Sequence, residues 1–566
     1  MNKVNKKYVK FLALLLAVVI VIGMSACTTP EDPATDSPGT PTGGPSSGTS
    51  TTPASPGSSG GGDPGSEVTG PANPERCGGV LNMAWALSPQ TFDPHYTTGW
   101  SSYIWSQNVY ETALVRDAEG RLQPMVCDFE LSDDFLTLKL WVREGVTFHN
   151  GAPVTIEDVV ASLERADMVA NVRNFFNGYT ESREVSGGVA TYTFESYNHN
   201  TLYYISGEHT WSAIIPKEIC DKYGEDPIIE VSDAIGTGPY KLTEAQLGVV
   251  FVMDRYDGYV PVPEGATGMA TPKYAYLDRI NYWINDDDTS LLMALMNGEY
   301  DITQLDNEYS ALAASNGIKT SPAPRNQMLY IPFNTKSDRP VNDSNLRKAI
   351  AAVLNYEDIR KFAWEGTETA EYCPMIGLYY TDKFNKADYA GAENTALARR
   401  YLEASGYDGE ELVIIASTSH VNIWPIVQAQ MEKIGIKSRV DYMDTNTFTA
   451  TYGDNDNDYD MVFLSSTTIS YVPSLLAVNF RTAFWGSERK DELFSTIAKE
   501  FYGNANSMAA WNELCNIWVD ECPIINLGIV ADMWYANGDL EINYNPGTAW
   551  EHHFNAYWNN PKEHIG

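Results

Sequence analysis

The 566-residue sequence predicts an exported protein of the α/β class, and three observations lead to that prediction. A short apolar segment near the N-terminus precedes a cysteine and a long stretch rich in Ser, Thr, Pro and Gly. About 490 residues of mixed composition follow, which is enough for two or three domains. Within them, strand-like and helix-like segments alternate, and that order favours sheets covered by helices.

The N-terminal segment has the pattern of a bacterial export signal. Four lysines within the first ten residues precede the apolar run 11–22. Twelve residues cover only ~18 Å of helix, less than the ~30 Å core of a bilayer. Ser25 and Ala26 stand directly before Cys27, as in a lipobox. We predict a lipoprotein signal peptide over 1–26 and a lipidated Cys27; the alternative is a chance cysteine beside an ordinary cleavage site.

Residues 27–75 are predicted to be a disordered tether. Nearly every side chain is small, hydroxylated, acidic or proline, so the segment cannot bury enough apolar surface to offset its ordering entropy. Signal, lipidated cysteine and tether together predict a folded part anchored on the extracellular or periplasmic face of the cell membrane.

Charge and cysteine content exclude several classes of protein. The chain has 38 basic and 74 acidic residues, a net charge of −36, which argues against a nucleic-acid partner. No second apolar run approaches 18 residues. Six cysteines remain besides Cys27 and allow 15 full pairings; free buried thiols are favoured slightly over disulfides, and no CxxC or HExxH motif indicates a metal site. The six are Cys77, Cys127, Cys220, Cys373, Cys515 and Cys522.

The predicted elements follow one another along the chain. Thr155 and Asp158 have capping-box spacing at a helix start. Gly406 and Gly435 are expected to end two later helices. The predicted strands are 81–85, 135–142, 412–416 and 436–440; the predicted helices are 101–115, one starting at 155, 345–354, 395–405 and 421–434.

A series of short motifs carries a family resemblance. In order they are Asp93-Pro94-His95, Val109-Tyr110-Glu111-Thr112, Leu122-Gln123-Pro124-Met125, Gly145 to Gly151, Gly236-Thr237-Gly238-Pro239-Tyr240, and residues 297–302, 331–335, 346–350, 404–407, 433–437 and 520–525. Together they resemble solute-binding protein family 5, the peptide and nickel class of ABC-importer receptors. Gly236 and Gly238 are expected to adopt φ values that a side chain would forbid.

The resemblance implies a fold and a function. It implies a two-lobed periplasmic-binding-protein-like α/β fold with a hinge, a ligand cleft between the lobes and an extra subdomain in lobe one. Lobe one would comprise 76–113, 235–322 and 530–566, the inserted subdomain 114–234, and lobe two 323–529. The protein would be a monomer without cofactor or catalysis that delivers a peptide to an ABC permease and its ATPase subunits. Oligosaccharide or nickel-chelate binding stays an alternative, as does, less favoured, a secreted hydrolase.

One departure from the peptide-binding members bears on the ligand. There, a Trp soon after a Tyr/Phe-Asp pair precedes an aspartate that holds the peptide amino group. Here Tyr459-Asp460 is followed over 461–469 by neither a tryptophan nor an acid. An ammonium enclosed without a carboxylate is costly, so another acid must replace it, or the hydroxyl-rich run suits an oligosaccharide.

Two segments are the predicted ligand contacts. They are Thr98, Gly99, Trp100 and Ser101 in lobe one, and Leu464, Ser465, Ser466, Thr467 and Thr468 in lobe two. Tryptophan side chains are further candidate contacts, as flat surfaces against which a sugar could stack, although any single tryptophan is more often a core residue. The candidates are Trp100, Trp105, Trp364, Trp424 and Trp485. His420 is the one histidine that we name for a nickel or haem chelate, and a lone histidine is more often structural.

Overall fold

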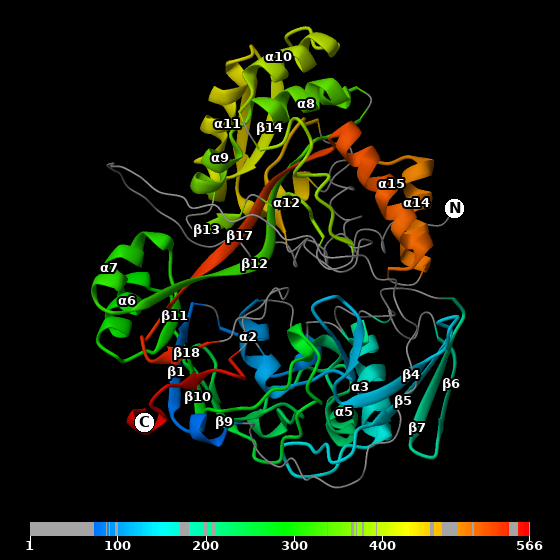
Figure 1. Ribbon diagram of the computed structural model, residues 1–566, viewed down its shortest axis with the longest axis vertical. Helices are drawn as coiled ribbons and strands as arrows, with labels where there is room; N and C mark the ends of the chain where they lie inside the picture. The colour runs from blue at the N-terminus through cyan, green and yellow to red at the C-terminus, as the bar shows by residue number, and fades with distance from the viewer. Residues whose placement is uncertain are drawn as a thin grey trace, which may run out of the picture.

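The two-lobed α/β fold is present in the computed structural model, which describes residues 73–86, 88–89, 91–96, 100–169, 180–196, 202, 204–206, 210–336, 338–363, 367–369, 371–375, 379–391, 393–452, 458–466, 485–500, 503–542 and 553–564. Figure 1 shows an upper and a lower lobe joined by two long strands that run diagonally between them. The predicted signal peptide, Cys27 and nearly all of the tether lie outside the described residues.

A nine-stranded sheet runs through both lobes. Its main path has the order β16-β12-β17-β11-β1-β10-β9-β8, and β13 pairs with β17 beside that path. The lobe-one strands are β1 (Val80–Trp85), β8 (Tyr240–Gln246), β9 (Val250–Arg255), β10 (Arg279–Ile284) and β11 (Ile302–Gln304). The joining strands are β12 (Lys319–Pro332) and β17 (Ile524–Ala536), and the short strands at the lobe-two end are β13 (Thr367–Thr369) and β16 (Leu464–Ser466).

The antiparallel pair β12 and β17 is the connection between the lobes. Lys319 at the start of β12 pairs with Ala536, which also pairs with Ile302 of lobe one. Pro332 at the other end of β12 pairs with Ile524, inside the core of lobe two. β12 therefore runs from lobe one into lobe two, and β17 returns.

The described part of lobe two also contains a parallel pair of strands and seven α-helices. The parallel strands are β14 (Leu412–Ser417) and β15 (Ser438–Met443). The helices are α8 (Ser344–Val353), α9 (Tyr356–Ala363), α10 (Thr395–Ala404), α11 (Ile423–Glu432), α12 (Thr445–Tyr452), α14 (Glu488–Lys499) and α15 (Ala505–Glu521). Every residue of β14 is buried, as expected for a strand covered on both faces.

Besides its strands in the nine-stranded sheet, lobe one contains smaller sheets and several helices. A hairpin of β2 (Leu114–Arg116) and β3 (Leu122–Pro124) leads into a four-stranded antiparallel sheet in the order β4-β5-β7-β6. These strands are β4 (Cys127–Leu131), β5 (Thr137–Val142), β6 (Thr180–Ser186) and β7 (Val189–Phe194), and β18 (Leu540–Glu541) pairs with β19 (Tyr557–Trp558) near the C-terminus. The helices are α2 (Trp100–Val109), α3 (Ile156–Met168), α5 (Lys217–Tyr223), α6 (Asp288–Met296) and α7 (Ser310–Ser315).

The buried residues fall into separate cores. One cluster spans 329–527 and belongs to lobe two. A second joins residues 81–110 with later segments up to 558 and is the core of lobe one. A third, 113–214, lies under the additional sheet. Residues 213–234 contribute Ala213, Ile219 and Ile228 to the second cluster.

Most predicted elements are confirmed. Thr155 caps α3 by accepting from the Asp158 N–H, and the Asp158 carboxylate accepts from Thr155 in return. Gly435 follows α11 with φ +87° as expected, but Gly406 has no positive φ, and α10 ends at Ala404 with Ser405 as its C-cap. The predicted helix 101–115 is too long, since α2 ends at Val109.

The role predicted for Gly236 and Gly238 is wrong, because neither has a positive φ. They are needed for close approach to the end of α2. A Cβ on Gly236 would lie 2.0 Å from the Val109 carbonyl oxygen, and a Cβ on Gly238 would lie 2.5 Å from that of Asn108. The Gly238 N–H donates to the Val109 carbonyl at 3.0 Å. This turn therefore covers the last helical carbonyls of α2, which explains where the helix ends.

The six cysteines within the described residues are free thiols, and five of them are buried. Among the described helices, none is long and apolar enough to cross a bilayer.

Candidate ligand-binding site

The parallel strands of lobe two end at an edge that faces lobe one. β14 and β15 are parallel, and Met461, just before β16, forms a parallel bridge with Ile414 of β14. β16 is antiparallel to β12, and β12 runs from lobe one into lobe two. β16 therefore runs toward lobe one. Ligands of open α/β sheets bind outside the carboxyl ends of such strands.

The backbone of Ser465 faces the open side of this edge. Val462 donates to Pro332 at 3.4 Å, and the Asp460 carbonyl accepts from Asn334 at 2.8 Å, whereas the Asp460 N–H donates to Val413 of β14 at 2.7 Å. From 462 on, residues 462 and 464 therefore point their backbone groups toward β12. Met461 accepts instead from Ile415 of β14 at 3.2 Å, on the opposite side. By this alternation the backbone N–H and C=O of Ser465 also point away from β12, toward the side on which β14 lies beside Met461. At the level of Ser465 that side is open, because β14 has already ended at Ser417. In this alternation Leu329 and Ser465 are a non-hydrogen-bonded pair, so the Ser465 backbone makes no hydrogen bond to β12.

The carboxylate of Asp460 is engaged in contacts within the protein. Its carboxylate lies 2.5 Å and 3.2 Å from Nη2 and Nε of Arg339. The same carboxylate accepts from the Val413 N–H at 2.7 Å. Asp460 is completely buried, so it ties β14 to the turn around Arg339 and is not presented to a ligand amine.

His420 borders the same edge. It ends the 3-10 turn Thr418–His420, which follows β14 directly, and its ring centroid is 5.0 Å from that of Phe463. Burial lowers the pKa of His420 to about 4, so the imidazole is neutral at pH 7. Next to it, Val421 is 45% exposed and Tyr442 is 43% exposed, and the Tyr442 hydroxyl donates to the Val421 carbonyl at 3.4 Å. The structure thus brings His420 to the ends of the lobe-two strands, beside an apolar rim.

The lobe-one side of the site is α2. Figure 1 shows α2 on the side of lobe one that faces lobe two. Trp100 and Ser101 begin α2; nothing is described of their side chains. Thr98, Gly99, Trp364, Thr467 and Thr468 lie outside the described residues. Of the predicted lobe-two segment, Leu464 and Ser465 are buried, and Ser466 pairs with Met328 through its backbone.

Three predicted aromatic platforms are core residues instead. Trp105 and Trp424 are completely buried, in α2 and α11 respectively. Trp485 is 4% exposed, its Nε1 donates to the Glu521 carboxylate, and Lys490 Nζ stands 4.2 Å from its ring centroid. Large aromatic side chains are stabilised most by full burial, and the structure gives no reason to keep these three as ligand contacts.

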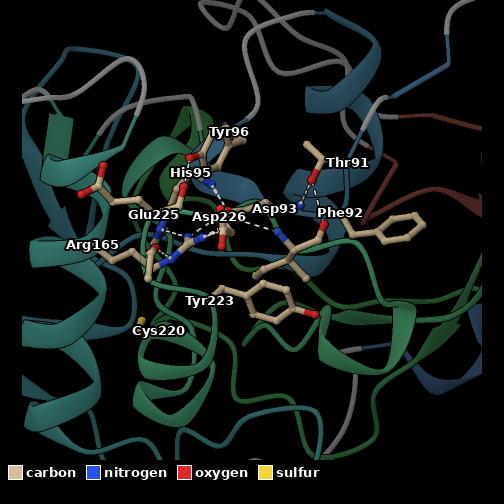
Figure 2. A network of polar contacts seen from close by, with 12 residues as sticks. Thr91, Phe92, Asp93, His95, Tyr96, Arg165, Cys220, Tyr223, Glu225 and Asp226 are labelled. Carbon is tan, nitrogen blue, oxygen red and sulfur yellow. Dashed lines mark hydrogen bonds and ion pairs between the residues drawn. The ribbon is translucent and has the colours of Figure 1, made fainter.

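A buried polar network holds the segment that leads into α2 (Figure 2). Asp93 forms an ion pair with Arg165 of α3 at 2.5 Å, and both side chains are almost wholly buried. Arg165 also donates to His95 Nδ1 at 2.8 Å, while His95 Nε2 lies 2.9 Å from the Ala213 carbonyl. Because Arg165 can only donate, His95 is neutral with its proton on Nε2. The network fixes the residues just before the predicted lobe-one contacts.

Comparison with known proteins decides the family. The model for "Bacterial extracellular solute-binding proteins, family 5 Middle" matches residues 95–487. The chain belongs to this family. A relative from Sinorhizobium fredii, named "Probable peptide ABC transporter periplasmic-binding protein", is 25% identical over 484 residues, which are 77% of this chain and 86% of the relative.

Solved structures show that this solute-binding protein shares the fold of its family. The ABC-transporter substrate-binding protein CtaP of Listeria monocytogenes has a TM-score of 0.70 at 20% identity, covering 85% of this chain and 99% of its own. The protein DppA of Helicobacter pylori, in complex with the peptide STSA, has a TM-score of 0.62 at 17% identity, covering 86% and 99%.

Sequence reasoning missed the exposed pair Val421 and Tyr442 and the partner of Asp460. No local signal pairs Arg339 with Asp460, because they are 121 positions apart along the chain and only the sheet brings them together. Val421 carried a usable signal, since it follows a buried strand in the turn before a helix, where α/β proteins place functional residues.

Proposed function

We propose that this solute-binding protein is the receptor of an ABC importer and captures peptides. The observation that carries the proposal is the open edge of β16. There the Ser465 N–H and C=O point to the side that faces no other described strand. A peptide in extended conformation presents the complementary pair of groups and can add a strand to such an edge. A ligand without a peptide backbone gains less from this pair.

The name of the Sinorhizobium fredii relative supports the same ligand class. The missing aspartate does not contradict it. With Asp460 committed to Arg339, the strand edge provides binding energy through main-chain hydrogen bonds instead of through the peptide amino group. Oligosaccharides and nickel chelates are then the ligands that the test must exclude.

The proposed contacts are reduced to those that lie at the facing edges of the two lobes. In lobe two they are the segment 464–468 together with His420. In lobe one they are residues 98–101 at the start of α2. Closure of the lobes around β12 and β17 would enclose the peptide, and the closed form would engage the permease and its ATPase subunits. No turnover is part of this proposal.

Anchoring and domain boundaries belong to the same proposal. We propose that Cys27 carries the lipid and that 27–75 is the tether. For the inserted subdomain we propose an end near residue 212 in place of 234, because residues 213–234 supply side chains to the lobe-one core. Lobe two is kept as 323–529.

The test is titration calorimetry of the purified full-length protein with peptides and their N-methylated analogues. Removing one backbone N–H that bonds the strand edge is expected to weaken binding by about 5- to 10-fold, since a neutral hydrogen bond contributes ~1 kcal/mol. Methylation at the next residue, which points the other way, should have little effect. Binding of oligosaccharides or nickel chelates, with none of peptides, would contradict the proposal.

A further inference from the structure

The apolar rim beside His420 consists of Val421 and Tyr442. Tyr442 belongs to β15, Val421 lies in the turn between β14 and α11, and the Tyr442 hydroxyl donates to the Val421 carbonyl at 3.4 Å. Both side chains are exposed. Single apolar side chains are common on any surface, but two that meet from separate segments form a patch that a ligand can cover.

The register of the strands places this rim beside the open edge of Ser465. Ile414 of β14 is directly beside Met461. β14 ends three positions after Ile414, at Ser417, so Leu464 is the last residue of the neighbouring strand with β14 beside it. Ser465 is the first residue past the end of β14. We call the place that β14 would fill there, if it continued, the open strand position.

The side chains next to the open strand position share one face of the sheet. By the same register, Ala416 of β14 is beside Tyr442 on one neighbouring strand and beside Phe463 on the other. Residues that are side by side on adjacent strands direct their side chains to the same face, and the direction alternates along each strand. Tyr442, Phe463 and Ser465 therefore point to one face.

The turn that follows β14 lies over this face. The His420 ring centroid is 5.0 Å from that of Phe463, and the next residue, Val421, accepts from Tyr442. Phe463 is only 2% exposed, so it is already covered. Val421 and Tyr442 are the apolar side chains of this group that stay exposed.

We propose that Val421 and Tyr442 form a subsite for an apolar side chain of the bound peptide. The inference rests on the proposed function and deepens it, since it names the residue type that the peptide prefers opposite Ser465. A peptide in the open strand position directs that side chain to the face that carries Tyr442. Diagonal neighbours on adjacent strands are roughly 7–8 Å apart, a distance that a leucine or phenylalanine side chain bridges.

Asp444 is the charged group that competes with this preference. It is exposed and lies two residues after Tyr442. Its carboxylate accepts from the Thr447 N–H at 3.1 Å and from the Thr447 hydroxyl at 2.6 Å, at the start of α12. An exposed ion pair contributes less free energy than the burial of a large apolar side chain. The subsite should therefore prefer leucine to lysine.

The experiment moves one leucine along an alanine tetrapeptide. The four leucine peptides and the all-alanine peptide are titrated into the full-length protein by calorimetry, followed by lysine and aspartate at the position where leucine binds best. At that position leucine should bind about 10-fold more tightly than alanine, because part of the larger side chain is buried. Lysine and aspartate should not exceed alanine.

Substitutions assign the preference to the rim. The double variant V421S/Y442S should lose the leucine preference, keep its affinity for the all-alanine peptide and melt near the wild type, because both side chains are exposed. Val185→Ser is the matched control, since Val185 is 40% exposed in β6, and it should keep the preference. Tyr442→Phe keeps the ring and should keep it too. If the double variant fails to fold, Tyr442→Ser alone should lose most of the preference.

Three outcomes would overturn the inference and leave the proposed function standing. The first is equal affinity for the alanine peptide and all four leucine peptides. The second is a leucine preference that V421S/Y442S, or Tyr442→Ser in its place, retains. The third is a lysine peptide that binds more tightly than its leucine counterpart. If no peptide of the series binds, the proposed function fails, and the subsite inference fails with it.

Discussion

Arg339 and the completely buried Asp460 form an ion pair with 2.5 Å between Nη2 and Oδ2. Asp460 belongs to the strand that carries the proposed ligand edge, and Arg339 follows the end of β12. Through Asp460 the pair ties the segment after β12 to the segment that leads into β16, and it keeps this carboxylate away from a ligand.

Replacing Arg339 by Met should destabilise lobe two strongly. The change leaves the Asp460 carboxylate buried without its cation, and we expect a loss of about 3–5 kcal/mol in the free energy of unfolding. Urea unfolding measures it. The double variant R339M/D460N removes both charges and should recover much of the loss. Equal losses in the single and double variants would show that the charge is not what matters.

Gly236→Ala should shift the end of α2 or unfold it locally. The new Cβ would meet the Val109 carbonyl oxygen at 2.0 Å, so backbone must move, and a loss of about 2–4 kcal/mol is expected for such a clash. Gly406→Ala is the control, because nothing lies within 4 Å of its added Cβ. Thermal unfolding of both variants decides the matter; similar melting temperatures would refute the close-approach explanation.

Acid should destabilise the protein between pH 6.5 and 4. Burial lowers the pKa of His95 to about 4, with the Asp93 charge acting in the opposite direction. The unfolded chain binds the proton near pH 6.5 and the folded one only near 4. The contribution to stability is therefore complete above pH 6.5 and is lost as the pH falls through this window.

For His95 alone, the free energy of unfolding should fall by roughly 3 kcal/mol across this pH window. Urea unfolding at pH 7, 5.5 and 4.5 should show it, and His95→Gln should flatten the curve by part of the total, because burial also lowers the pKa of His149 and His553 to about 4. An unchanged pH dependence in His95→Gln would mean that folding does not lower the pKa of His95.

Thr155→Ala should remove the cap of α3. The Asp158 N–H would lose its acceptor, at an expected cost of about 0.5–2 kcal/mol. Thr155→Ser keeps the hydroxyl and serves as the control in the same urea titration. A loss in the serine variant as large as in the alanine variant would locate the effect in packing and not in the cap.

Cys27→Ser should release the protein from the membrane. If Cys27 is lipidated, the wild type fractionates with membranes and incorporates labelled palmitate, and the serine variant does neither. Membrane association that survives the substitution would contradict the anchor.

Much of the fold follows from sequence patterns that act locally. The capping residues Thr155 and Asp158 lie three positions apart, and the buried strand β14 is a continuous apolar run, so both could be predicted. The end of α2 could not, because it depends on Gly236 and Gly238 more than 120 positions later in the chain.

The site was predictable only in part. The position of Ser465 followed from the family motif, but its outward backbone depends on where β14 stops beside it. The burial of Trp424 and Trp485 and the pairing of Asp460 with Arg339 arise from contacts between distant segments, which no spacing along the chain records.

Hydrogen exchange at the Ser465 amide, with and without bound peptide, tests the central claim most directly. The amide points away from β12 in this structure, so it should exchange rapidly in the free protein and become protected when peptide binds. The β14 amides should be protected in both states. A peptide that binds tightly while residues 464–466 keep their free-state exchange would contradict the account.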